Sequence, residues 1–272
     1  MTLFQSIILG IIQGASEFLP ISSSGHLVIA PYLFGWDINP LEAFVFDVLV
    51  QVATLIAVII YYWKDLIDIL KAFIQGIITK KPFAENNSRL GWYLILATIP
   101  AGAAAILFKD TFETAFSDPK SAAIFLLVTS LLLLSGEYFG KRIRNLESIN
   151  PLDALIIGFF QVLALFPGIS RSGSTITGGL LRKFDRSGSA RFSFLMAVPV
   201  MSAAGVLALA DLLANPELVQ NIPVYLGGFV TAAIVGYAAI RWFINYLSRR
   251  SLYIFAGYCA ILGITFLLLY KP

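Results

Sequence analysis

The sequence predicts an all-α integral membrane protein built from two inverted repeats. Hydrophobic residues make up 58% of the 272 residues and charged residues 13%, whereas about a quarter of the residues of a soluble domain are charged. The stretch 8–30 also aligns with the stretch 156–179 at a constant offset of 148 residues (156 minus 8). We expect a single membrane domain over 1–272, with repeat one at 1–140 and repeat two at 150–272. Each repeat would be a re-entrant helix hairpin plus three transmembrane helices, giving six full spans and two re-entrant hairpins.

The composition excludes several classes of protein. Membrane-length apolar runs occupy most of the chain, so we expect no separate soluble domain and no nucleic-acid partner. No Lys or Arg precedes Lys64, so the chain lacks the basic start of a cleaved signal peptide, and we expect the N-terminus to be mature structure. A single cysteine, Cys259, excludes an internal disulfide and a multi-cysteine metal site.

The two aligned stretches share a break of the same composition. At the offset of 148 residues (161 minus 13) the identical pairs are Gly10 with Gly158, Gln13 with Gln161, Ile21 with Ile169, Ser22 with Ser170, Ser24 with Ser172 and Gly25 with Gly173. Where the first copy has Glu17 and His26, the second has a leucine and a serine. Ser23 stands opposite Arg171. The first copy therefore carries the titratable groups and the second carries the cation.

The elements follow from the apolar runs taken in order. The first run, 3–34, is too long for one ordinary span, and Pro-Ile-Ser-Ser-Ser-Gly interrupts it at 20–25. A break at membrane depth is tolerated where the freed backbone groups line a polar cavity, which favours a helix–loop–helix hairpin. The second hairpin is expected at 151–181. The expected spans are 41–63, 91–108, 121–139, 188–210, 223–246 and 252–270.

The loop 64–89 is the longest in the chain. Its portion 65–78, DLIDILKAFIQGII, places apolar and polar groups at helical spacing. This pattern predicts a helix lying at the cytoplasmic interface. The alternative is a simple continuation of the preceding span.

The basic residues indicate the topology. Of the 19 Lys and Arg residues, Arg171 lies at a hairpin tip, which leaves 18 to be divided between the two faces. If each hairpin returns to its own side, fifteen lie on one face and three, Lys109, Lys120 and Lys271, on the other; if each hairpin crosses once, the division is nine against nine. The positive-inside rule favours the first arrangement. We therefore expect a multi-pass protein of the cell membrane with both termini outside and a site that opens outward.

The first hairpin carries candidate acid–base groups. Gln13 and Glu17 are four residues apart, so a helix places both on one face, directed toward the break. A carboxylate inside a membrane usually marks a functional path, although it could merely satisfy a neighbouring helix. His26 follows across the break. Ser22 and Ser24 are either helix caps or ligands of the substrate, and Ser23 faces Arg171 in the alignment.

The second hairpin carries an expected anion site. The break 167–173, PGISRSG, places hydroxyls, helix N-terminal amides and the Arg171 guanidinium together. Such amides bind phosphate, and a guanidinium adds a bidentate fork. Ser170, Ser172 and Thr175 would lie around the anion, and Gln13 of the first hairpin is also expected to bind the substrate. The alternative for Arg171 is a purely structural ion pair with Glu17.

The pairing of QGASEFLPISSSGH with PGISRSGSTITGG resembles the bacitracin-resistance family of undecaprenyl-diphosphate phosphatases. The resemblance implies a hydrolase that removes the terminal phosphate of a polyprenyl diphosphate and so regenerates the lipid carrier of cell-wall synthesis. It implies that Glu17, His26 and Arg171 are catalytic, with Ser23, Ser170, Ser172 and Thr175 around the diphosphate. It also implies a divalent cation, Mg²⁺ or Ca²⁺, for which Glu17 and Gln13 are the candidate ligands. The expected partners are this lipid and the bilayer, and a homodimer is allowed.

The residues leave the mechanism open. His26 can act as general base or as nucleophile while Glu17 fixes its tautomer, and Ser23 is the competing nucleophile, activated by His26. Water is a third nucleophile. A secondary transporter or lipid flippase is the main alternative function, since inverted repeats with broken helices are common in transporters. A non-catalytic lipid-binding scaffold is the other.

Overall fold

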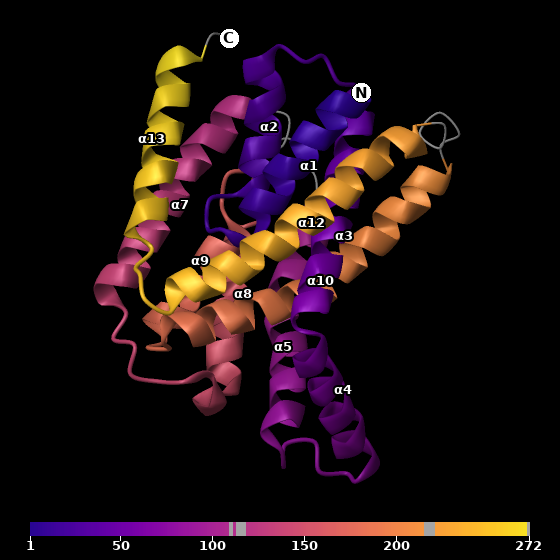
Figure 1. Ribbon diagram of the computed structural model, residues 1–272. Coiled ribbons are helices and arrows are strands. Elements are labelled where there is room, and N and C mark those ends of the chain that lie inside the picture. The colour runs from indigo at the N-terminus through magenta and orange to yellow at the C-terminus, as the bar shows by residue number, and fades with distance from the viewer. Residues whose placement is uncertain (109–110, 113–117, 215–220, 271–272) are drawn as a thin grey trace.

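Helices dominate the computed structural model, which describes residues 1–108, 111–112, 118–214 and 221–270 (Figure 1). The eleven α-helices of these residues are α1 (Leu3–Phe18), α2 (Ser23–Phe34), α3 (Pro40–Tyr61), α4 (Trp63–Ile78), α5 (Asn86–Leu107), α7 (Pro119–Phe139), α8 (Pro151–Leu163), α9 (Arg171–Leu181), α10 (Arg186–Ala214), α12 (Ile222–Leu247) and α13 (Tyr253–Leu269). A short 3₁₀ helix, η1 (Leu146–Ser148), precedes α8. The all-helical fold class is confirmed.

Four of the described helices are long and apolar enough to cross a membrane, namely α3, α5, α7 and α12. The chain is a multi-pass membrane protein. Two more helices match expected spans: α10 is 29 residues long and α13 is a shorter apolar helix of 17 residues. The expected spans begin and end within a few residues of the observed helices, because apolar length and helix-breaking residues both mark the ends. Asn39, for example, caps α3 by accepting a hydrogen bond from Leu41 N at 2.9 Å.

Each of the two broken runs folds back on itself. In the first, α1 and α2 return to one end, where the rings of Phe4 and Trp36 lie 6.4 Å apart. In the second, α8 and α9 return to one end, where Arg182 Nε lies 2.6 Å from Asp153 Oδ1. Both short hairpins are thus confirmed as helix–loop–helix units.

The tips of the two hairpins meet inside the bundle. Ser172 Oγ donates to the carbonyl oxygen of Leu19 at 3.1 Å. Gly168 has φ of +98°, and a Cβ there would lie 2.8 Å from Phe125 Cβ, so this position requires glycine. The contact between the tips brings together the two stretches that the internal alignment singled out.

The ends of several helices are tied together by buried ion pairs at the end where α8 begins and α9 ends. Asp153 is fully buried and pairs with Arg144 at 2.7 Å as well as with Arg182. Glu137 of α7 pairs with Arg186 of α10 at 2.6 Å. If an arginine moved away from its partner, the buried carboxylate would be left as an uncompensated charge. These pairs therefore hold the helix ends in register.

The segment 65–78 is helical, as the sequence predicts. Tyr62 alone separates α4 from α3, and α4 projects with the start of α5 from one end of the bundle (Figure 1). It packs against α5 through Gly76, whose Cβ position would lie 2.6 Å from Ser88 Oγ. Its place at the membrane interface stays a prediction.

Candidate active site

The first hairpin tip begins α2 with a serine cap. Ser22 has φ of +69°, and its Oγ accepts a hydrogen bond from Gly25 N at 3.2 Å. Ser22 Oγ also lies 3.3 Å from Ser24 Oγ. Ser22 therefore caps α2, and the side chain of the next residue, Ser23, reaches Glu17 of α1.

The second tip begins α9 in the same way. Ser170 Oγ accepts from Gly173 N at 3.0 Å and lies 3.1 Å from Ser172 Oγ. Thr129 of α7 fixes this loop, because its hydroxyl accepts from Ser170 N at 2.9 Å. The repeated sequence thus produces a repeated cap, and each cap turns a helix N-terminus toward the other hairpin.

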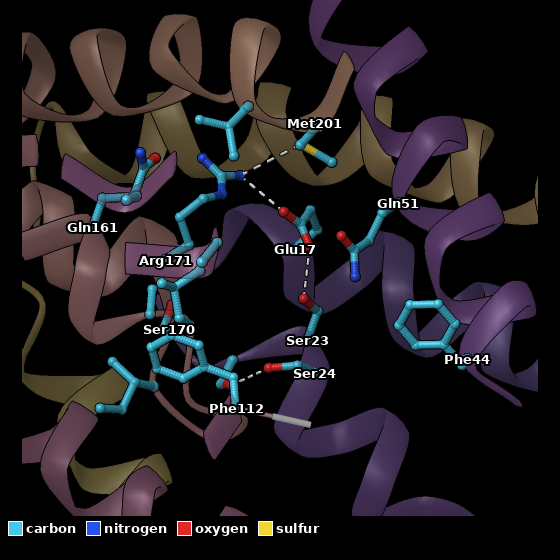
Figure 2. A pocket seen from close by; sticks show the side chains of 17 residues that line it. Glu17, Ser23, Ser24, Phe44, Gln51, Phe112, Gln161, Ser170, Arg171 and Met201 are labelled. Carbon is cyan, nitrogen blue, oxygen red and sulfur yellow. Dashed lines mark hydrogen bonds and ion pairs between the residues drawn. The ribbon is translucent and has the colours of Figure 1, made fainter. Parts of the chain in front are cut away.

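Glu17 is the centre of the polar contacts between the tips (Figure 2). Its Oε1 lies 2.8 Å from Arg171 Nη2. Its Oε2 accepts from Ser23 Oγ at 2.6 Å and from Gln13 Nε2 at 3.0 Å. Glu17 is 8% exposed, so these contacts replace the water that its charge would otherwise require.

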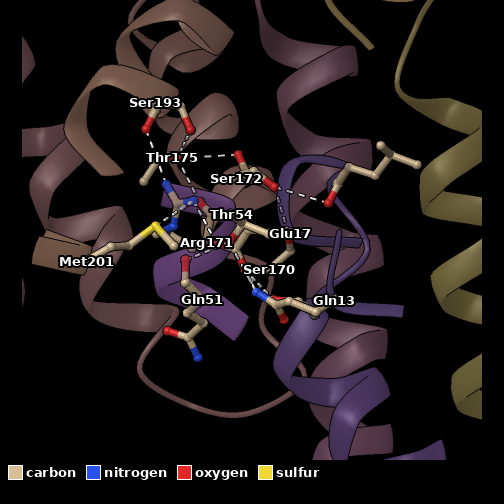
Figure 3. A network of polar contacts seen from close by, with 12 residues as sticks. Gln13, Glu17, Gln51, Thr54, Ser170, Arg171, Ser172, Thr175, Ser193 and Met201 are labelled. Carbon is tan, nitrogen blue, oxygen red and sulfur yellow. Dashed lines mark hydrogen bonds and ion pairs between the residues drawn. The ribbon is translucent and has the colours of Figure 1, made fainter. Parts of the chain in front are cut away.

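Arg171 is the first residue of α9, and α10 supports it (Figure 3). Its Nη1 donates to the carbonyl oxygen of Ser193 at 3.3 Å, and Nη2 lies 4.0 Å from Met201 Sδ. The hydroxyl of Thr175 contacts Ser193 Oγ at 2.7 Å and donates to Arg171 O at 2.7 Å. Thr175 therefore connects the backbone of Arg171 to Ser193 of α10.

A cavity of about 310 Å³ lies beside the Glu17–Arg171 pair. Its polar wall includes Ser23, Ser24 and Ser170, and the rest of its wall is largely apolar, with Phe44 and Phe112 on it. The volume is at the small end of the range for ligand sites. A charged group of a few oxygen atoms can reach Arg171 here while an apolar chain stays against the wall.

His26 does not contact Glu17. Its Nδ1 lies 2.7 Å from the carbonyl oxygen of Ser22, and its Nε2 lies 2.7 Å from the hydroxyl of Tyr258 on α13. The two rings are stacked with centroids 5.7 Å apart. The expectation that Glu17 fixes the tautomer of His26 is wrong, because the Ser22 carbonyl lies one helical turn back along α2 and takes that place.

The sequence reasoning missed several residues at the site. Gln51, Gln161 and Met201 line the cavity, and Ser193 holds Arg171. The identity of Gln161 with Gln13 in the repeat alignment was the available signal for Gln161. Tyr258, Ser193 and Met201 come from helices far along the chain, and their residue types carry no pattern that would have marked them.

A metal site made by the protein alone does not fit the described residues. They contain no group of three His, Cys, Asp or Glu side chains that could hold a metal ion. In the cluster, Glu17 is the carboxylate and both of its oxygens already have partners. The buried Oε1 of Gln13 has no hydrogen-bond partner among the described residues.

Comparison with known proteins decides the family. The family of bacitracin resistance protein BacA matches residues 6–265. The chain belongs to the BacA family. Relatives called undecaprenyl-diphosphatase include a protein of Chlorobaculum parvum, 44% identical over 99% of this chain and 97% of the relative. Another, from Chloroherpeton thalassium, is 41% identical over 97% of this chain and 95% of the relative. A third, from Moorella thermoacetica, is 41% identical over 97% of this chain and 96% of the relative. The similarity to the BacA family covers both hairpins and all the helices between them.

Proposed function

We propose that the protein hydrolyses undecaprenyl diphosphate in the cavity beside the Glu17–Arg171 pair, between the two hairpin tips. The chain releases the terminal phosphate and leaves undecaprenyl phosphate, the lipid carrier of cell-wall synthesis. The observation that carries this proposal is the Glu17–Arg171 pair, 2.8 Å apart, with Ser23 on the same carboxylate. A base, a hydroxyl and a cation at one cavity suit phosphoryl transfer, in which positioning and charge neutralisation do most of the work.

Arg171 and the start of α9 bind the diphosphate. The arginine offers a planar fork, and the helix N-terminus offers N–H groups and a positive dipole end. Ser22, Ser24, Ser170 and Ser172 shape the two loops around this position through their caps. The diphosphate takes over Arg171 from Glu17, so substrate binding frees the carboxylate to act as a base.

Ser23 is the nucleophile in this proposal. Its Oγ attacks the terminal phosphorus, its proton passes to Glu17 Oε2 at 2.6 Å, and the bond from phosphorus to the bridging oxygen breaks. Glu17 returns this proton to an oxygen of the undecaprenyl phosphate as it leaves. Water then attacks the phosphoserine and gives a proton to Glu17, and the P–O bond to Ser23 breaks, so that inorganic phosphate is released and Ser23 Oγ takes the proton back. His26 remains a proposed catalytic residue. Its Nδ1 contacts the Ser22 carbonyl and so helps to hold the hairpin tip. The ring reaches phosphate directly only after its hydrogen bond to the Tyr258 hydroxyl breaks.

A divalent cation, Mg²⁺ or Ca²⁺, is proposed from the family resemblance. Mg²⁺ sites commonly combine one or two carboxylates with substrate phosphates. Glu17 and the unpartnered Gln13 Oε1 would be its protein ligands, with the diphosphate supplying the others. The cation would neutralise phosphate charge, and the proton transfer described above does not depend on it.

The architecture of two inverted repeats is part of the proposal. Equivalent glycines support it, because Gly10 of α1 meets Gly228 of α12 and Gly158 of α8 meets Ala97 of α5 in the same close approach. The two repeats would be 1–140 and 150–272, making six full spans and two re-entrant hairpins in a single membrane domain.

The orientation is proposed from charge. Arg144 and Arg182 lie at the end where α8 begins and α9 ends, and Lys64 lies in the first turn of α4. These residues belong to the face with fifteen basic residues. We assign that face to the cytoplasm, with both termini outside and the cavity opening outward. Lys109 and Lys271, two of the three opposing residues, lie outside the described residues.

A homodimer also stays a prediction, which light scattering of the purified protein in detergent tests.

Phosphate release tests the function. Purified protein in detergent should release inorganic phosphate from undecaprenyl diphosphate, and the Arg171→Ala variant should not. A transporter or flippase would instead take up the lipid diphosphate without hydrolysing it. If the wild-type protein releases no more phosphate than Arg171→Ala and proteoliposomes take up the lipid diphosphate, transport replaces hydrolysis as the proposed function.

A further inference from the structure

Gln161 is a buried amide without a hydrogen-bond partner. It lies in the last turns of α8 and is 2% exposed, and neither its Nε2 nor its Oε1 reaches a polar atom of the described residues. Burying an unpaired amide opposes folding, because the group loses its water and gains nothing in return. A side chain of this kind needs an explanation.

Its position separates it from the other unpartnered buried groups. The indole of Trp92 and the hydroxyl of Ser189 also lack partners, but neither lines the cavity. Gln161 does line it, on the Arg171 side and opposite Gln51 (Figure 2). The unpaired donor and the cation that binds phosphate in the proposed function therefore line the same cavity.

The internal repeat explains why the partner is missing. Gln161 occupies the position of Gln13, since 161 minus 148 is 13. Gln13 Nε2 donates to the carboxylate of Glu17, one turn further along α1, at 3.0 Å. In the second copy the residue four positions further on is Leu165, just past the end of α8, and its side chain can accept no hydrogen bond. The same amide that serves a fixed anion in the first hairpin has no anion in the second.

We propose that Gln161 is a substrate-binding residue that donates its amide N–H to a phosphate oxygen of the lipid diphosphate held by Arg171. This rests on the proposed function, which supplies the diphosphate. Both amide atoms are shielded from solvent. To reach a phosphate oxygen, the end of the side chain turns toward the cavity when the ligand binds. That rotation breaks no hydrogen bond, because the amide has none to lose.

The test uses Gln161→Met, which keeps the length of the side chain and removes both polar atoms. The matched control is Gln75→Met, at an exposed position of α4. The probe is farnesyl methylenediphosphonate, whose carbon bridge cannot be hydrolysed, and the KM for undecaprenyl diphosphate is measured beside it. We expect the Kd and the KM of Gln161→Met to rise roughly tenfold while kcat changes less. The thermal midpoint should stay equal or rise, because no native hydrogen bond is lost.

Two results would overturn the inference. Normal Kd and KM in Gln161→Met would show that ordered water satisfies the amide, and a lowered thermal midpoint with normal KM would show a structural role. If this variant does not fold, Gln161→Leu answers the same question by the same measurements. The failure of the proposed function is distinct: wild-type protein would then bind the diphosphonate without releasing phosphate from the natural lipid.

Discussion

Glu17 Oε1 and Arg171 Nη2 lie 2.8 Å apart although 154 residues separate them in the chain. This ion pair joins the two hairpin tips, and it joins the residues that distinguish one copy of the repeat from the other. In the protein without substrate, the Glu17 carboxylate and the Arg171 guanidinium neutralise each other's charge at a site of low dielectric constant. A bound diphosphate would exchange places with the carboxylate on Arg171, which links substrate binding to the release of the base.

Arg171→Lys should lose most activity while the protein still inserts and folds. Lysine keeps the positive charge but cannot hold two phosphate oxygens in a planar fork, nor reach Ser193 O and Glu17 together. We expect kcat/KM to fall on the order of 100-fold. Phosphate release and size-exclusion chromatography of the same sample measure this. Near-normal turnover would mean that Arg171 acts as a diffuse charge.

Ser23→Ala should abolish turnover as deeply as Glu17→Gln, whereas His26→Ala should lose less. Ser23 Oγ contacts Glu17 directly, while His26 is held by Ser22 and Tyr258 on the far side of the loop. Steady-state phosphate release by the three variants provides the comparison. A loss in His26→Ala that exceeds the loss in Ser23→Ala would contradict Ser23 as the nucleophile.

Tyr258→Phe separates two roles of His26. The variant removes the hydroxyl 2.7 Å from Nε2 but keeps the stacked ring. If His26 reaches phosphate after leaving Tyr258, this variant should be at least as active as the wild type. A loss as large as that of His26→Ala would show that the hydrogen bond itself supports catalysis.

Gly168→Ala should destabilise the fold. Gly168 has positive φ, and a Cβ there would overlap the carbonyl oxygen of Ala122. We expect a loss of about 1–3 kcal/mol, the usual cost of overpacking a close-packed site. Gly102→Ala is the control, since a Cβ there meets no atom within 4 Å. Equal thermal midpoints for the two variants in detergent would contradict the packing described at the tips.

The proposed topology predicts labelling from one side. In a Cys259→Ser background, a cysteine at Lys81 should resist an impermeant thiol reagent in intact cells, and a cysteine at Thr2 should react. Lysis should expose the cysteine at Lys81. Labelling of that position in intact cells would reverse the orientation and remove the positive-inside argument.

Much of the fold could be predicted from the sequence, because apolar length and helix breakers act locally. The predicted breaks at 20–25 and 167–173 overlap the observed breaks at 19–22 and 164–170. The alignment of Ser23 with Arg171 also points to a shared site, and the sequence allows the Glu17–Arg171 pair as a structural contact. The tautomer of His26 could not be predicted in this way. Its partner Tyr258 is 232 residues away and is one of 11 tyrosines, so nothing local marks it.

The most direct test of a single site shared by the two hairpins is a double-mutant cycle on Glu17 and Arg171. Initial rates of phosphate release from undecaprenyl diphosphate are measured for wild type, Glu17→Gln, Arg171→Ala and the double variant. Residues that act as a unit give strongly non-additive losses. We predict that the double variant is about as slow as the slower single variant. Losses that multiply, or a single variant that retains wild-type turnover, would contradict the account.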